Sequence, residues 1–269
     1  VVVGDPLQVE PVVTIPKVLI DILADSTGVA NEYKVIENSA QTFADNINEF
    51  SGMIGERQVG CPLVVHRRCI EPMFSISNMI SYDNRMFNKT HKKEDYLKQE
   101  QPFLIKKSGW INVEGTENGS KDHFVKNQAE RVCQLLENAL HIYTNLYETD
   151  DKIFIITPFR TVAESMRKFV IGYFSVKGYD KEMLTKWTKN CVGTVHTFQG
   201  KDANEVLFVL GCSDKSVGAM NWVVKKANIL NVACTRAKYR IAFIGNLNDW
   251  KNRRYFREFI PKFIDAIDA

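Results

Sequence analysis

The sequence lacks closely spaced cysteine pairs, although it contains six cysteines. Structural zinc sites usually draw thiolates from C-x-x-C pairs, so we expect no metal site in this chain. The sequence also lacks a signal peptide and any apolar run long enough to cross a bilayer. Free thiols in a reducing cytosol are the simplest interpretation, and we therefore expect a cytoplasmic protein with no membrane partner.

Neither sign of charge dominates. The 269 residues include 35 lysines and arginines against 32 aspartates and glutamates, and 45% of the chain is hydrophobic. These values are typical of a globular protein, and the mildly basic balance permits a nucleic-acid partner without requiring one. The chain also lacks an initiator methionine and opens with three valines before Gly4-Asp5. We interpret these valines as a short buried strand, and the chain as a piece of a longer protein cut on its N-terminal side.

Apolar strands and amphipathic helices alternate along the chain. Further strands are predicted at 62–66, 152–157, 191–195, 205–210 and 240–245. A first helix is predicted after a cap at Thr14, with its inward face formed by Val18, Leu19, Ile22 and Leu23. Another begins at a capping box formed by Thr161 and Glu164. The remaining predicted helices cover residues 43–50, 125–139 and 250–263. This alternation predicts an α/β fold, with a mostly parallel sheet covered by helices on both faces.

Residues 85–120 are polar and rich in lysine, and glycines gather near their end. Acidic residues partly balance these lysines. We interpret the segment as an insertion or surface excursion with a solvated face rather than as a nucleic-acid arm.

Polar and basic residues follow the predicted strands. Ligands of open α/β sheets bind beyond the carboxyl ends of the strands, so we expect these residues to share one edge. Their chemistry suits a ligand with several phosphates, because arginine binds phosphate through a rigid donor fork. The residues are Gln8, Arg67, Arg68, Thr157, Thr194, His196, Gln199 and Lys201.

Arg236 lies in the predicted helix NVACTRAK (231–238). At about 100° per residue, its side chain lies roughly 90° from the centre of the apolar stripe. We therefore expect it at the rim of the buried face, able to point into a cleft. The stripe is formed by Ile229, Leu230, Ala233, Cys234 and Ala237.

Five stretches resemble, in order, the third to sixth motifs of superfamily-one helicases, in the branch of the nonsense-mediated-decay RNA helicase. They are GDPLQVEPVV, VVHRRCIEPMFSISNMISYDNRM, ITPFR, VGTVHTFQGKDANEVLFVLG and NILNVACTRAKYRIAFIGN. The resemblance implies that residues 1–60 are the tail of a first RecA-like domain with its connection, and that 61–269 are the second RecA-like domain. No GxxxxGK[ST] pattern occurs, so the phosphate loop and most Mg²⁺ ligands would belong to an upstream domain, the intramolecular partner.

The resemblance also implies roles for single residues. Arg236 would be the arginine finger, Arg68 would contact the γ-phosphate, and Gln8 would sense that phosphate and the attacking water. Arg67 stands where relatives often have a tyrosine that stacks on adenine, and a guanidinium plane can stack in the same way. The residues facing the nucleotide would be Gln199, Gly200, Lys201 and Asp202, and those near the nucleic-acid strand would be Thr157, Thr194 and His196. Gly200 is most simply a backbone turn.

The resemblance implies an ATP- and Mg²⁺-dependent helicase or translocase on single-stranded DNA or RNA. The alternative is a non-catalytic nucleic-acid-binding or scaffolding module that kept the fold. A nucleotidyl transferase or nuclease needs clustered carboxylates, whereas the acidic residues here are dispersed. Because the phosphate loop is absent, we expect this chain alone to hydrolyse little or no ATP.

Overall fold

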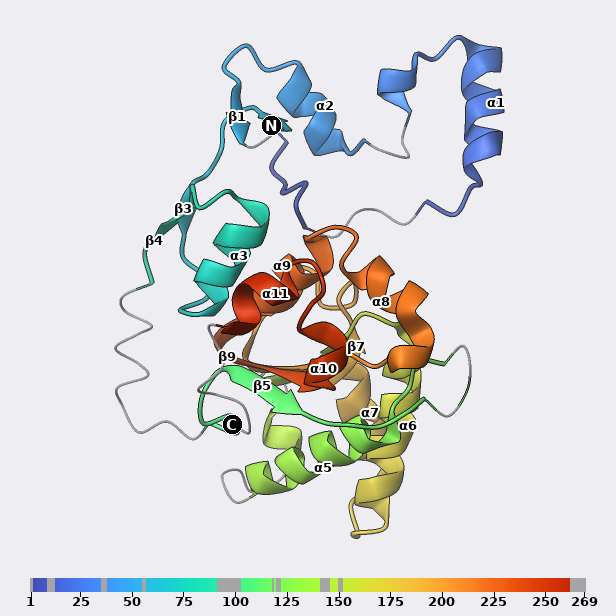
Figure 1. Ribbon diagram of the computed structural model, residues 1–269, viewed down its shortest axis with the longest axis vertical. Helices are drawn as coiled ribbons and strands as arrows, with labels where there is room; N and C mark the ends of the chain where they lie inside the picture. The colour runs from blue at the N-terminus through green and yellow to red at the C-terminus, as the bar shows by residue number, and fades with distance from the viewer. Residues whose placement is uncertain are drawn as a thin grey trace.

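A five-stranded parallel sheet forms the centre of the computed structural model, with strand order β5-β9-β8-β6-β7. The strands are β5 (Gly109–Asn112), β6 (Ile153–Thr157), β7 (Val192–Thr194), β8 (Ala203–Val209) and β9 (Ala237–Gly245). The structure describes residues 2–8, 13–34, 38–54, 57–90, 103–117, 119, 122–140, 146–149 and 152–261. In Figure 1 helices lie on both sides of this sheet, which confirms the predicted α/β class.

Two helical layers cover the sheet (Figure 1). One layer contains α5 (Lys126–Leu140), α6 (Arg160–Ser175) and α7 (Lys181–Cys191). The opposite layer contains α3 (Met73–Ser81), α9 (Asn228–Arg236) and α11 (Phe256–Phe259). Shorter helices are α8 (Val217–Val223), α10 (Leu247–Trp250), η1 (Asn31–Tyr33), η2 (Leu146–Thr149) and η3 (Asp214–Ser216). None of the helices in the described ranges is long and apolar enough to span a bilayer.

The core follows the predicted periodicities. Every residue of β6 is buried, as expected for a central strand of a parallel sheet. The predicted stripe of α5 faces inward, with Ala129, Val132 and Leu136 completely buried. On the other side, the Trp110 ring stacks on Phe243 at 6.0 Å, which joins β5 to β9.

The first 60 residues form smaller elements at the top of Figure 1. They are α1 (Lys17–Thr27), α2 (Ala40–Asn46) and a hairpin of β1 (Gly52–Ile54) with β2 (Arg57–Val59). A second small sheet pairs β3 (Val65–His66) with β4 (Phe87–Asn88) in parallel.

Two predictions for this N-terminal part are wrong. Val2 and Val3 are 49% and 79% exposed and lie outside any strand. Helix α1 begins after Pro16 without a side-chain cap, and it buries Ile20 and Ala24 instead of the predicted face. The predicted inward residues are all exposed: Val18, Leu19, Ile22 and Leu23. Apolar spacing identified a helix but could not show which face is covered.

The segment 85–120 is not a surface excursion throughout. Its residues 109–112 form β5, an edge strand of the main sheet, and Trp110 is completely buried. The strand is short and follows two lysines, so polar composition concealed it. Residues 91–102 lie outside the described ranges.

Two helix boundaries also differ from the predictions. Helix α6 begins at Arg160 with Phe159 at its N-cap. Thr161 instead donates to the Asp122 carbonyl at 2.8 Å, and Glu164 pairs with Arg160 at 2.8 Å. The single C-terminal helix is replaced by the short helices α10 and α11, and Phe263 lies outside the described ranges.

Candidate nucleotide and nucleic-acid site

Helix α9 is buried on almost all sides, and Arg236 at its end is 0% exposed. The prediction that Arg236 lies at the rim of the buried face is therefore wrong. The helix contacts α3 along one side and β8 and β9 along another, so its polar flank is covered by protein as well.

The Arg236 guanidinium is held by neutral oxygen atoms. Its Nη1 donates to the Lys201 carbonyl at 2.9 Å and to the Phe198 carbonyl at 3.3 Å, and its Nη2 donates to Thr235 Oγ1 at 3.2 Å. Its Nε has no hydrogen-bond partner within the described residues. Burial, with the nearby Arg68, lowers the pKa of Arg236 to about 10, so the group is still charged at neutral pH. The site thus contains a buried cation with unused donor capacity.

Of the predicted nucleotide residues, Arg68, Lys201 and Asp202 lie near this cation. Arg68 is half-buried and close enough to lower the pKa of Arg236. The Asp202 carboxylate forms an ion pair with Lys238 at 2.7 Å. Gly200 has a φ of +85°, which confirms that it forms a turn in the left-handed region. Gln199 and Arg67 are exposed, and their roles stay predictions.

Two asparagines of α9 hold the loop that carries Gln8. Asn231 Nδ2 donates to the Leu7 carbonyl at 2.9 Å and to Tyr82 Oη at 3.1 Å. Asn228 Nδ2 donates to the carbonyl of Gln8. The Tyr82 hydroxyl donates to Asp5 Oδ2 in the same loop. One helix therefore positions both Gln8 and Arg236.

Sequence reasoning did not single out Tyr82, Asn228 or Asn231. Asn231 is completely buried although it lies outside the predicted apolar stripe of this helix, so its spacing gave no signal of its role. Burial, with the adjacent Asp5, raises the pKa of the Tyr82 hydroxyl, so it is protonated and able to donate at neutral pH. These residues join separate chain segments, which composition and spacing do not show.

The predicted single edge is wrong, because the residues divide between two ends of the sheet. Thr157 and Thr194 are register partners at the carboxyl ends of β6 and β7. Ala203 and Ala237 pair at the beginning of β8 and β9, next to Asp202 and Arg236. At about 3.3 Å per residue, the ends of β8 are roughly 20 Å apart. The segment 194–202 connects them, and its Phe198 ring stacks on Phe154 of β6 at 4.3 Å.

The predicted nucleic-acid residues differ in exposure. Thr157 is 1% exposed, and its Oγ1 accepts a hydrogen bond from the Phe159 amide at 3.4 Å. Thr194 is half-buried, with its Oγ1 3.2 Å from Thr197 Oγ1. His196 is exposed, although partial burial lowers its pKa below the ordinary value. Thr194 and His196 are therefore accessible, whereas Thr157 is covered.

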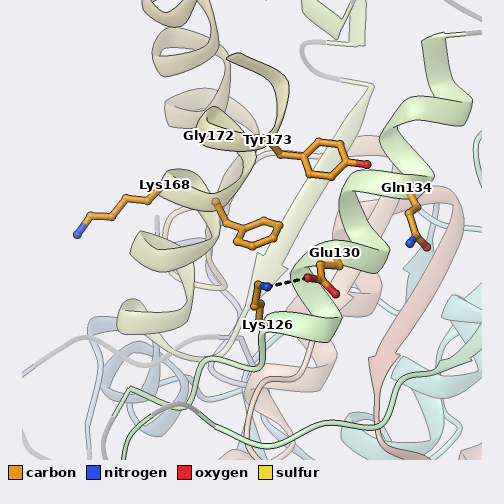
Figure 2. A pocket seen from close by; sticks show the side chains of 7 residues that line it. Lys126, Glu130, Gln134, Lys168, Gly172 and Tyr173 are labelled. Atoms are coloured by element: carbon orange, nitrogen blue, oxygen red, sulfur yellow. Dashed lines mark ion pairs between the residues drawn. The ribbon is translucent and has the colours of Figure 1, made fainter. Parts of the chain in front are cut away.

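A hollow of about 580 Å³ lies elsewhere, between α5 and α6 (Figure 2). Its lining includes Phe169 and Tyr173, whose rings stack at 6.4 Å, and the ion pair of Lys126 with Glu130 at 3.1 Å. Figure 2 shows Lys168 pointing away from the other lining side chains. None of the predicted site residues lines this hollow, so it is separate from the Arg236 site.

Comparison with known proteins gives the chain a family. The model of a family described as AAA domain matches residues 49–248, which is most of the chain. The chain belongs to this AAA domain family. An uncharacterized ATP-dependent helicase from Methanocaldococcus jannaschii is 26% identical over 214 residues, covering 74% of this chain and 28% of that protein. The parallel sheet of this AAA domain is consistent with a RecA-like P-loop NTPase fold.

The described part of the AAA domain offers no group of three metal-ligating side chains beside Arg236. The nearest carboxylate in the predicted site, that of Asp202, is already paired with Lys238. The described residues therefore do not form a Mg²⁺ site at the arginines.

Proposed function

We propose that this chain is part of an ATP-dependent helicase or translocase of superfamily one that acts on single-stranded DNA or RNA. The observation that carries the proposal is the completely buried Arg236 guanidinium, which is bound by two carbonyls and a hydroxyl and keeps a free Nε. Burying a cation is costly, and the carboxylate that acts on Arg236, that of Asp202, is shared with Lys238 at 2.7 Å. A phosphate oxyanion at this position would reduce that cost. The helicase with which the chain shares 26% identity supports the same conclusion.

A transferring phosphoryl group is the ligand that this arrangement suits. The site contains two guanidinium groups, Arg236 and Arg68, that lie close enough for their charges to interact. Two adjacent cations repel one another, and an anion with charge on several oxygens attracts both. Arg236 acts in this proposal as the arginine finger and Arg68 as a second γ-phosphate contact, while Gln8 lies on the loop that α9 holds.

The segment 194–202 links the proposed ATP site to the proposed nucleic-acid site. Its first residues, Thr194 and His196, are accessible at the carboxyl end of β7 and would contact the nucleic-acid backbone. Its last residues lead to β8 and bind Arg236 through the Lys201 carbonyl. A change in the position of Arg236 during hydrolysis would therefore reach the strand-binding end through one continuous segment.

The proposal needs a second domain. The phosphate loop and the Mg²⁺ ligands would lie upstream, with residues 1–60 as the end of that first RecA-like domain and 61–269 as the second. The relative supports this arrangement, because the chain spans only 28% of its length. We expect the 269-residue chain alone to show little or no Mg²⁺-dependent ATP hydrolysis.

The test is steady-state ATP hydrolysis by the full-length gene product with and without single-stranded DNA or RNA. We expect strong stimulation by one of these polymers, decreasing as salt increases because phosphate contacts dominate such binding. A protein that binds the strand without hydrolysing ATP would instead establish the non-catalytic binding module.

A further inference from the structure

Three potential metal ligands meet at the carboxyl end of β8, away from Arg236. The ligand atoms of Glu117, His123 and Cys212 all lie within 4.8 Å of one another. Glu117 and Cys212 are buried, and the His123 side chain is 21% exposed. They come from two chain segments that are about ninety residues apart, which is why sequence spacing predicted no metal site.

The separation between His123 and Glu117 fits a tetrahedral ion. Ligands at about 2.0–2.3 Å from Zn²⁺ lie roughly 3.3–3.8 Å apart in a tetrahedron. His123 Nδ1 is 3.3 Å from Glu117 Oε2. Ser216 Oγ lies 3.1 Å from His123 Nδ1 and donates to Glu117 Oε2 at 2.8 Å, closer than two ligands of one tetrahedron, so it would orient these ligands rather than bind the ion. The longest separation, up to 4.8 Å, requires an inward movement of about 1 Å.

The surrounding backbone holds the ligands in place. His123 and Cys212 both adopt left-handed φ values, +54° and +57°, and the Cys212 amide donates to the His123 carbonyl at 2.9 Å. Such conformations in residues other than glycine cluster at functional sites. The Ser213 amide donates to Glu117 Oε1 at 2.7 Å, which orients the carboxylate as an outer-shell partner does in metal sites.

The same contacts exclude a hydrolytic triad. Ser216 Oγ and Glu117 Oε2 both face Nδ1 of His123, whereas a triad needs the nucleophile and the carboxylate on opposite ring nitrogens. A metal ion, in contrast, would use this convergence on one nitrogen.

We propose that Glu117, His123 and Cys212 bind a structural Zn²⁺ ion. Binding would release the Cys212 thiol proton to solvent and leave the remaining imidazole proton on Nε2 of His123. A tetrahedral set of sulfur, nitrogen and oxygen ligands is typical of Zn²⁺ sites. The ion would fix Glu117 and His123 against the carboxyl end of β8. The adjacent Asp122 carbonyl accepts a hydrogen bond from the Thr161 hydroxyl of α6, and the ring centroids of His123 and Phe159 lie 4.8 Å apart. The ion would therefore stabilise the carboxyl end of β6, where Thr157 lies.

Cobalt titration of the 269-residue chain tests the proposal. We expect about one Co²⁺ per chain, with a thiolate-to-cobalt charge-transfer band and the visible bands of a tetrahedral ion, and displacement by Zn²⁺. Cys212→Ser should abolish the charge-transfer band, and His123→Gln should weaken binding at least about 100-fold. Cys61→Ser, at an exposed thiol, and Cys69→Ser, at the thiol 3.1 Å from His66 Nε2, should keep the band.

The wild-type spectrum decides the outcome even where a variant does not fold. No cobalt uptake, or uptake without a thiolate band, would contradict the proposal and leave the three side chains as a structural hydrogen-bonded cluster. A band that survives in Cys212→Ser and disappears in Cys69→Ser would also overturn it.

Discussion

Arg236 Nη1 at the end of α9 donates a 2.9 Å hydrogen bond to the Lys201 carbonyl, 35 residues earlier in the chain. This bond joins the helix to the segment that leads from β7 to β8. On its N-terminal side the same helix binds the loop of residues 5–8 through Asn228 and Asn231. Helix α9 therefore connects two separate segments, and its side chains contribute to stability as well as to the proposed chemistry.

Replacing Asn231 with alanine should destabilise the fold by about 1–3 kcal/mol, because its partners lose their hydrogen bonds. The partners are the buried Ser77 hydroxyl and the half-buried Leu7 carbonyl and Tyr82 hydroxyl. Urea unfolding of the 269-residue chain measures this change. Asn252→Ala, at an exposed position, is the control and should alter stability by less than about 0.5 kcal/mol. Equal stability of the two variants would show that the α9 contacts are not needed for folding.

Two glycines offer a matched test of the turn at residue 200. A Cβ atom added at Gly200 or at Gly172 would have no neighbouring atom within 4 Å, so steric contact is not the difference between them. Gly200 has a φ of +85°, whereas Gly172 lies inside α6. We expect Gly200→Ala to cost about 1–2 kcal/mol and Gly172→Ala to stabilise by up to about 1 kcal/mol. Unfolding free energies in urea compare them, and similar values would contradict the assigned turn.

Glu205 of β8 gives the fold a pH-dependent contribution. Its carboxylate accepts from the Leu104 and Ile105 amides at 2.8 and 2.7 Å. Burial nevertheless raises its pKa to about 7 from an ordinary value near 4.5, opposed by those amides and by Arg240. Between these pH values the folded state binds more protons than the unfolded state. The contribution of this group is therefore full below pH 4.5 and decreases as the pH rises through 7.

Glu205→Gln should remove this dependence. We expect the free energy of unfolding of the wild type, relative to that of the variant, to decrease from about pH 5 to about pH 7 by on the order of 1 kcal/mol per pH unit. Urea unfolding at several pH values across this interval measures it. A difference that stays constant over this range would show that Glu205 does not titrate there.

The sequence was sufficient for the class of the fold but not for the site's geometry. Periodic apolar residues predicted α5 and β6 because those patterns depend only on which residues are buried. Strand β5 was missed because it is short and lies next to lysines. Arg236 was placed at a rim because a helical projection describes one helix and not its neighbours, and α3 together with the loop at Phe198 covers the remaining side. The division of the site between two sheet ends required the strand register.

The most direct test of the proposed function is kcat for ATP hydrolysis by the full-length gene product carrying Arg236→Lys, at saturating single-stranded nucleic acid. Lysine keeps the charge but lacks the planar donor fork, so we expect kcat to decrease at least several hundredfold. Arg167→Lys is the control, because Arg167 also donates to a main-chain carbonyl, that of Val192, but lies on α6. It should change kcat by no more than a few-fold. If Arg236→Lys retained wild-type kcat while the protein stayed folded, Arg236 would not be an arginine finger.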